Sequence, residues 1–136
     1  MKATDKSEEN PIFPQGDKAS PDYFRGNAWV KLLVNESNNV IANVTFEAGA
    51  RNNWHTHPGG QILLVTDGTG YYQEKGSPIQ LIQRGDVIKI APNLKHWHGA
   101  SADSELTHIA ITTNTPTGAV NWLERVTDEE YNSYKP

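Results

Sequence analysis

The chain has 136 residues and a mass of 15.1 kDa, a length typical of one domain that needs no disulfide or structural metal to fold. Its net charge of −4, with no cluster of Lys or Arg, argues against binding to nucleic acid or to an anionic membrane surface. The absence of cysteine excludes disulfides, thiolate metal sites and cysteine nucleophiles. Because the sequence has no long apolar run and starts with the polar segment MKATDKSEEN, we expect a cytoplasmic protein without a membrane span.

The predicted organisation is a polar tail or edge-pairing arm over residues 1–19, followed by one domain over residues 20–136. Phe24 to Val34 is rich in residues that favour strands. Val40 to Glu47 alternates with a period of two, which predicts a half-buried strand. One face of that strand carries Val40, Ala42, Val44 and Phe46.

Six further short strands are predicted, separated by turn residues such as Asp67-Gly68. They are Gln61–Thr66, Gly70–Glu74, Ile79–Gln83, Asp86–Ala91, Lys95–Ala100 and Leu106–Thr112. Regular short strands with little helix between them indicate an all-β fold, an antiparallel sandwich or barrel. The capping box from Thr127 to Glu130 predicts a short C-terminal helix.

All five histidines of the sequence lie between residues 55 and 108. His55 and His57 are two residues apart, as are His96 and His98, and residues two apart on a strand project from the same face. A single His-x-His pair is most often a surface or hydrogen-bonded pair. Two such pairs, with no histidine outside residues 55–108, favour one shared metal site, because neutral imidazole is a common ligand of divalent metals.

The segments GARNNWHTHPGGQILLVTDG and GDVIKIAPNLKHWHGA resemble the two motifs of the cupin family. Cupins are small antiparallel β-barrels of the jelly-roll type that hold one metal ion in the barrel mouth. The first motif supplies two histidines and a glutamate, and the second supplies a third histidine. The resemblance therefore implies the metal ligands His55, His57, Gln61 and His96.

This sequence departs from the family pattern at the fourth ligand, where Gln61 replaces the usual glutamate. The second motif also differs at Pro92, Asn93 and Ala100, although His96 keeps its spacing. Three imidazoles and an amide leave the full charge of a divalent ion at the site, which makes it a stronger Lewis acid. The alternative is that the Gln61 amide only hydrogen-bonds a bound water, leaving a site of three histidines.

The segments PDYFRG, VTFEAGARNNWHTHPGGQ, KHWHGA, THIAI and AVNWLERVTDEEY resemble a subgroup of cupins. The subgroup includes bacterial manganese-dependent hydroxynitrile lyases and small cupins related to carboxymuconolactone decarboxylase-like proteins. The resemblance implies a lyase in which a divalent ion, Mn before Fe, Zn or Ni, acts as a Lewis acid on a small-molecule substrate. A histidine base would then help to break the C–C bond of a cyanohydrin-like or hydroxy compound.

In that subgroup active-site histidines correspond to His98 and His108, and His108 is the preferred base. The alternative role for both is a hydrogen bond that orients a metal ligand. Ala42 and Val44 are expected as small walls of the substrate pocket. Asn52 stands where those lyases carry a hydroxyl residue, so it is placed in the pocket as well.

Two other functions remain open from the sequence: a cupin dioxygenase with iron, nickel or copper, and a barrel that binds a small molecule without catalysis. The first would consume oxygen, whereas the lyase would not. Because cupins commonly pair through their sheets, a homodimer or a higher homo-oligomer is also expected.

Overall fold

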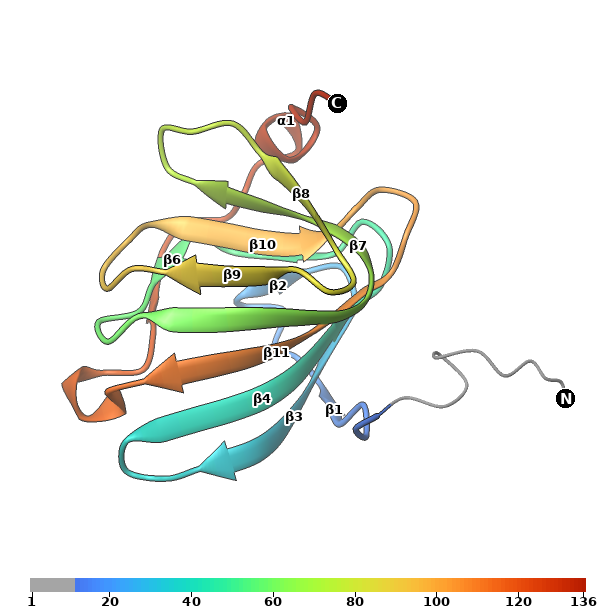
Figure 1. Cartoon of the computed structure of the whole chain (residues 1–136). Coiled ribbons are helices and arrows are strands. Elements are labelled where there is room, and N and C mark those ends of the chain that lie inside the picture. Colours follow the sequence, from blue (N-terminus) through green and yellow to red (C-terminus); the bar gives the residue numbers. More distant parts are fainter. Residues whose placement is uncertain (1–11) are drawn as a thin grey trace, which may run out of the picture.

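The computed structural model describes residues 12–136, which form a curled antiparallel sheet with one short helix near the C-terminus (Figure 1). The strands are β1 (Asp17–Lys18), β2 (Phe24–Arg25), β3 (Ala28–Asn35), β4 (Asn39–Phe46), β5 (Arg51–Asn52), β6 (His55–Thr56), β7 (Gln61–Glu74), β8 (Gln80–Gln83), β9 (Val87–Ile90), β10 (His96–Ala100), β11 (Leu106–Thr113) and β12 (Asn121–Trp122). The 3₁₀ turn η1 covers Thr115–Thr117 and the helix α1 covers Asp128–Tyr131. The predicted all-β barrel with a short C-terminal helix is confirmed.

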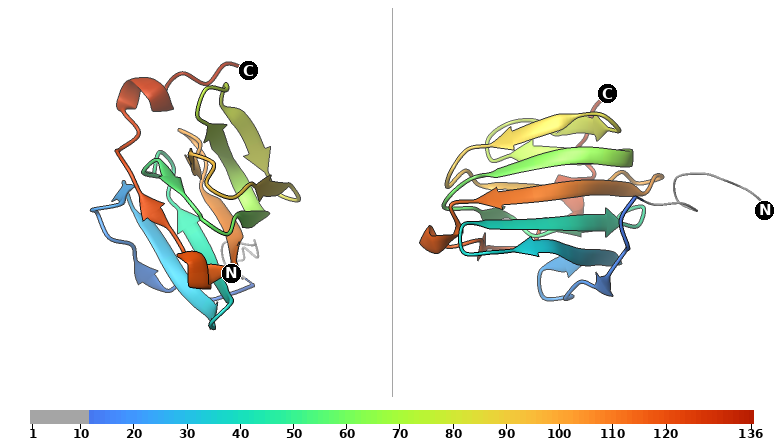
Figure 2. Two further views of the ribbon diagram at one scale, coloured as in Figure 1. Left: turned by 90° about the vertical axis from the view of Figure 1, so that its left-hand side faces the viewer. Right: turned by 60° about the horizontal axis from the view of Figure 1, so that its bottom comes forward.

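The strands form two layers that face each other. In the front layer β3, β4, β11, β7 and β9 lie side by side, as the right-hand view of Figure 2 shows, and β1 pairs with the outer edge of β3. In the back layer the second half of β7 pairs with β8 and β10, and β10 also pairs with the short strands β5 and β6. Within residues 12–136, no helix is long and apolar enough to span a bilayer.

The long strand β7 belongs to both layers and corrects the prediction of two strands separated by a turn. The chain bends at Gly68 without reversing, and the pairing with β11 shifts register between Thr107 and His108 beside the bend. Gly68 has φ +79°, and a Cβ atom there would overlap the carbonyl oxygen of Glu105. A turn dipeptide and a strand corner need the same left-handed glycine, so the residue types alone did not separate them.

Replacement of Gly68 by alanine is expected to lower the free energy of unfolding by about 3 kcal/mol, because it adds backbone strain to a steric overlap with the neighbouring strand. Gly76 provides a matched control, since its φ is +87° but an added Cβ would meet open space. Gly76→Ala should cost only about 1 kcal/mol, from the backbone alone. Urea unfolding of both variants measures the difference; equal losses would contradict the steric explanation.

The first predicted β-rich segment also divides in the structure. Between Phe24–Arg25 and Ala28–Asn35 the chain turns at Gly26, which has φ +81°. The consequence is that β2 leaves the front layer and pairs with β5 in the back layer. The segment from Phe24 to Val34 therefore supplies one strand to each layer.

The inner faces of the two layers enclose a core at one end of the barrel and a cavity at the other. At the core end Phe46 pairs with Leu106, and both are fully buried. At the other end of the same strands Val40 pairs with Thr112, which lines the cavity. The apolar face of β4 points into the barrel, as the alternation predicts. The strand is not half-buried, however, because Asn43 and Thr45 on its outer face are buried as well.

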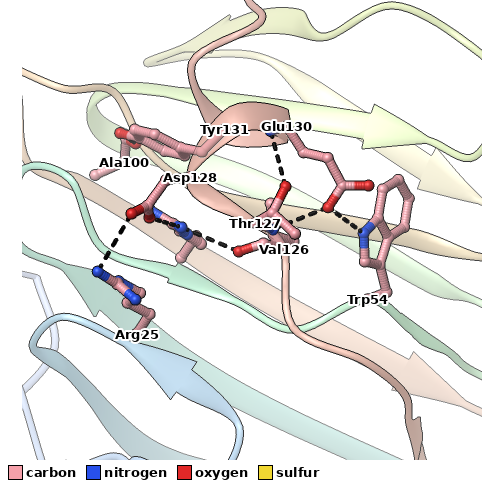
Figure 3. Close-up of polar contacts among 9 residues, drawn as sticks. Arg25, Trp54, Ala100, Val126, Thr127, Asp128, Glu130 and Tyr131 are labelled. Atoms are coloured by element: carbon pink, nitrogen blue, oxygen red, sulfur yellow. Dashed lines mark hydrogen bonds and ion pairs between the residues drawn. The ribbon is translucent and has the colours of Figure 1, made fainter.

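The C-terminal segment is fixed against the back layer by polar contacts (Figure 3). The Arg51 guanidinium donates to the carboxylate of Asp128 at 2.7 Å and to the carbonyl of Val126 at 3.0 Å, and it lies 4.6 Å from the ring centroid of Tyr131. The Tyr131 hydroxyl donates to the carbonyl of Ala100 at 2.6 Å. These contacts join α1 to β5 and β10, the strands that carry the pocket side of the back layer.

The predicted capping box is confirmed at the start of α1. The Thr127 hydroxyl accepts the backbone N–H of Glu130 at 3.0 Å, and the Glu130 carboxylate accepts the backbone N–H of Thr127 at 2.9 Å. The same carboxylate also accepts from the indole nitrogen of Trp54 at 3.3 Å (Figure 3). This helix therefore begins at the residue that its sequence motif predicts.

Candidate metal centre

The five histidines come from three separate segments of the chain and meet inside the barrel. His55 lies on β6 and is paired across the back layer with His96 on β10. His57 follows β6 in a turn, and His98 is two residues beyond His96 on the same strand. His108 comes from β11 in the front layer. All five side chains are buried.

The rings pack against one another closely. The ring centroids of His55 and His96 are 4.2 Å apart, those of His55 and His57 are 4.9 Å apart, and those of His57 and His96 are 5.3 Å apart. Ring nitrogens of His55, His96 and His98 all lie within 4.8 Å of one another. A buried group of three histidines that could hold a metal ion is therefore present, as the clustering in the sequence predicts.

Backbone carbonyls set the orientation of three of these rings. The Nδ1 atom of His55 donates to the carbonyl of Asn53 at 2.7 Å, because only an N–H can pair with a carbonyl. In the same way Nδ1 of His57 donates to Ala119 at 2.7 Å and Nδ1 of His96 donates to Leu94 at 2.9 Å. Each neutral ring therefore carries its free lone pair on Nε2, the arrangement that metal-bound histidines use.

Three buried atoms near the histidine rings have no hydrogen-bond partner in the described chain, and all three are of types that bind a cation. Among residues 12–136, Nε2 of His57, Nε2 of His96 and Oε1 of Gln61 are buried and have no hydrogen-bond partner. A buried polar atom without a partner costs about 1–3 kcal/mol, so three in one place need an explanation. Two imidazole nitrogens and an amide oxygen, with His55 beside them, fit a divalent ion of the first transition row.

His98 is closer to His55 and His96 than the family motif implies, but its nitrogens already have neighbours. Its Nδ1 lies 3.1 Å from Nε2 of His108. The Asn52 amide holds it from the other side. Its Oδ1 accepts the backbone N–H of His98 at 3.0 Å, and its Nδ2 lies 3.3 Å from Nε2 and 3.4 Å from Nδ1 of the ring, where it donates to the nitrogen that carries the lone pair. The structure thus brings together Asn52, His98 and His108 as a hydrogen-bonded group beside the other three histidines.

Burial keeps all five histidines uncharged at neutral pH. Desolvation lowers the pKa of His96 and of His108 from 6.5 to about 4. Desolvation, reinforced by the neighbouring imidazoles, lowers the pKa of His55 and of His98 well below 6.5. Desolvation also lowers the pKa of His57, although the Ala119 carbonyl and the Gln61 side chain oppose it. At neutral pH all five rings are therefore uncharged, which is the form of histidine that binds a metal ion.

The metal-free protein is expected to lose stability as the pH falls from about 6.5 to about 4. In this window the unfolded chain binds protons on histidines that the native protein keeps neutral, so acid favours unfolding. His96 and His108 would each contribute about 3 kcal/mol over the full window. Urea unfolding of chelator-treated protein at several pH values measures the effect, and His108→Gln should reduce it. A free energy of unfolding that is constant from pH 7 to 4.5 would contradict the prediction.

A cavity of about 260 Å³ opens beside the histidines. Its polar lining consists of Asn52, His55, His57, Gln61, His98, His108 and Thr112. Its apolar lining consists of Phe24, Val30, Val40, Ala42, Val44, Ala110, Ala119, Val120 and Trp122. The predicted pocket residues Ala42, Val44 and Asn52 all lie in this wall. Among the described residues, no Asp, Glu, Lys or Arg side chain lines it.

Part of this wall could not be predicted from the sequence. Ala119, Val120 and Trp122 come from the segment after β11, which has no clear strand or helix pattern. Trp122 lies with its ring centroid 4.8 Å from that of His55, and the Ala119 carbonyl orients His57. The aromatic residue was visible in the sequence, but only the pairing of β12 with β6 brings it to the site.

Comparison with known proteins identifies the family. The model of the cupin domain matches residues 42–112. An (R)-mandelonitrile lyase from Granulicella tundricola is 44% identical over 117 residues, covering 84% of this chain and 89% of the relative. Among solved structures, a cupin-like protein from Thermotoga maritima is 50% identical, with a TM-score of 0.88 over 91% of this chain and 97% of that one.

A more distant structure shares the fold alone. It is an uncharacterised protein with a double-stranded β-helix domain from Klebsiella pneumoniae, 15% identical, with a TM-score of 0.65 over 91% of this chain and the whole of that one. The domain match covers just over half of the chain and coincides with the strands that carry the histidines. The chain belongs to the cupin family.

Proposed function

We propose that this cupin is a metal-dependent lyase that cleaves the C–C bond of a neutral cyanohydrin to give an aldehyde or ketone and hydrogen cyanide. The main support for the proposal is that two groups of histidines lie next to each other at one cavity whose lining has no charged side chain among the described residues. One group has unpartnered ligand atoms, and the other forms a hydrogen-bonded pair next to it. The 44% identity to an (R)-mandelonitrile lyase supports the choice of reaction.

The metal ligands in this proposal are His55, His57, Gln61 and His96. Backbone carbonyls fix Nδ1 of the three histidines. Nε2 of His57, Nε2 of His96 and Oε1 of Gln61 are buried without a partner in the described chain. His98 is left out of the set, since Asn52 and His108 already contact its nitrogens. A bound divalent ion, which we propose to be Mn²⁺, would supply Lewis acidity that lowers the pKa of a substrate hydroxyl group and stabilises negative charge on its oxygen. The neutral glutamine, in place of a carboxylate, leaves that charge undiminished.

His108 is the proposed base. If its Nε2–H donates to Nδ1 of His98 at 3.1 Å, then Nδ1 of His108 carries a free lone pair, and this atom has no hydrogen-bond partner in the described chain. Nδ1 would take the proton of the substrate hydroxyl group. His98, held by Asn52, orients the ring of His108 and shares the positive charge that His108 gains.

The bond changes balance without a further reactant. The electron pair of the O–H bond forms the carbonyl, and the C–CN bond breaks with its pair moving to cyanide. Cyanide then takes the proton from His108 and leaves as hydrogen cyanide, which returns the neutral base. The apolar part of the cavity lining suits an aryl or alkyl group of the substrate.

The test is cyanide release from racemic mandelonitrile by protein loaded with Mn²⁺ and then desalted, measured under argon and in air. The proposal predicts equal rates in both atmospheres and loss of activity after treatment with a chelator. Absence of cyanide release above the buffer rate would contradict it. Oxygen uptake on addition of a substrate would instead identify a dioxygenase, the alternative enzyme that the same metal ligands could serve.

A further inference from the structure

Thr112 stands directly opposite Gln61 across the β11–β7 pair, and both side chains point into the barrel. The Thr112 hydroxyl accepts the side-chain N–H of Gln61 at 2.9 Å. Both residues are 6% exposed. We infer that Thr112 is a positioning residue of the metal centre, which holds the Gln61 amide so that its oxygen rather than its nitrogen faces the three histidines.

This role is needed because an amide can turn over. Rotation by 180° about the last side-chain bond exchanges the oxygen and the nitrogen of Gln61 with almost no change of shape. Only the oxygen has lone pairs for a cation, whereas the NH₂ group would repel one. When the oxygen faces the histidines, the buried NH₂ group needs an acceptor, and the Thr112 hydroxyl is the acceptor in its path. A glutamate at this position would not need this help, since both of its ends are oxygens.

The neighbouring backbone holds Thr112 in place. The Thr113 hydroxyl donates to the carbonyl of Gly59 at 3.1 Å, which joins the end of β11 to the turn that precedes Gln61. Gly59 allows this approach, because a Cβ atom there would overlap the carbonyl oxygen of Thr113. The hydrogen bond between Thr113 and Gly59 therefore fixes the strand register that sets Thr112 opposite Gln61.

The inference rests on the metal centre of the proposed function, and its readout is metal affinity, measured with Mn²⁺ from the electron paramagnetic resonance signal of the free ion. Thr112→Val keeps the shape and the burial but removes the acceptor. The expected result is an affinity about 10-fold or more below that of the wild type, the cost of one buried unpaired N–H. Thr112→Ser keeps the hydroxyl group and should bind Mn²⁺ within about 3-fold of the wild type.

Two further variants separate positioning from general structural damage. Thr107→Val makes the same change on the same strand, but this hydroxyl contacts Thr45 on the outer face, so affinity should not change. In a Gln61→Ala background, Thr112→Val should have no additional effect, because the residue through which it acts is gone.

The outcomes distinguish this inference from the proposed function. If the wild type binds Mn²⁺ and Thr112→Val binds it as tightly, the role of Thr112 is refuted while the metal centre stands. An equal loss in Thr112→Val with and without Gln61 would also refute it. If the wild type itself binds no Mn²⁺, the metal centre fails, and the inference fails with it.

Discussion

Replacement of His96 by alanine is expected to abolish metal binding and lyase activity together. His96 is fully buried, its Nδ1 is committed to the carbonyl of Leu94, and its Nε2 has no other partner among residues 12–136. Loss of a residue that only orients a ligand typically costs 10- to 100-fold in metal affinity, so loss of the ligand itself should cost at least about 100-fold. Metal content should therefore fall from about one ion per chain to less than about one tenth after desalting.

A control must show that the loss is specific to the site, and no histidine outside the cluster exists for this purpose. Gln73→Ala is suitable, because Gln73 accepts the indole N–H of Trp97 at 2.8 Å on the other side of the same pair of strands. This variant loses a side-chain hydrogen bond of β10 but should keep its metal ion. Retention of a full complement of metal by His96→Ala would exclude His96 as a ligand.

The second large effect is expected at His108, where substitution should reduce activity without reducing metal content. His108→Ala should lower kcat for cyanohydrin cleavage by about 10²- to 10⁴-fold, the usual contribution of a general base, while metal content stays at the wild-type level. The reason is that His108 comes from the front layer and contacts the site through His98. Metal content and cyanide release are measured on the same sample.

His98 decides between two assignments of the same cluster. The nitrogen distances group it with His55 and His96, whereas its contacts with Asn52 and His108 place it in the proton-transfer pair. His98→Ala should lower kcat and leave metal content unchanged. Loss of metal from this variant would instead make His98 a ligand. Unchanged activity in His108→Ala would remove the base from the proposed mechanism.

The sequence predicted the fold well because its signals were local. The capping box at Thr127 depends on residues within one element and is confirmed. The alternation over residues 40–47 identified the inward face of β4 correctly, but its outer face is buried too, which the pattern did not predict. The prediction of a turn at Asp67-Gly68 was wrong. Gly68 has a backbone conformation typical of a turn, but it continues the strand β7, which stays paired with β11. The two-residue strands of the back layer are too short to show a period at all.

The sequence predicted which residues form the candidate site better than it predicted the contacts between them. Spacing identified the histidine pairs, and the resemblance to cupins added Gln61. Strand register was needed to set Thr112 against Gln61, because the two are 51 residues apart. The packing of Trp122 on His55 likewise depends on a C-terminal segment that crosses to β6.

In the proposed site the buried histidines and Gln61 hold a divalent metal ion. The most direct measurement is metal content by plasma mass spectrometry on untagged protein, as purified without chelator and again after loading with Mn²⁺ and desalting. We expect close to one divalent ion per chain after loading. If neither sample retains metal, the proposed metal centre is wrong, and what is left is a barrel that binds a small molecule without metal chemistry.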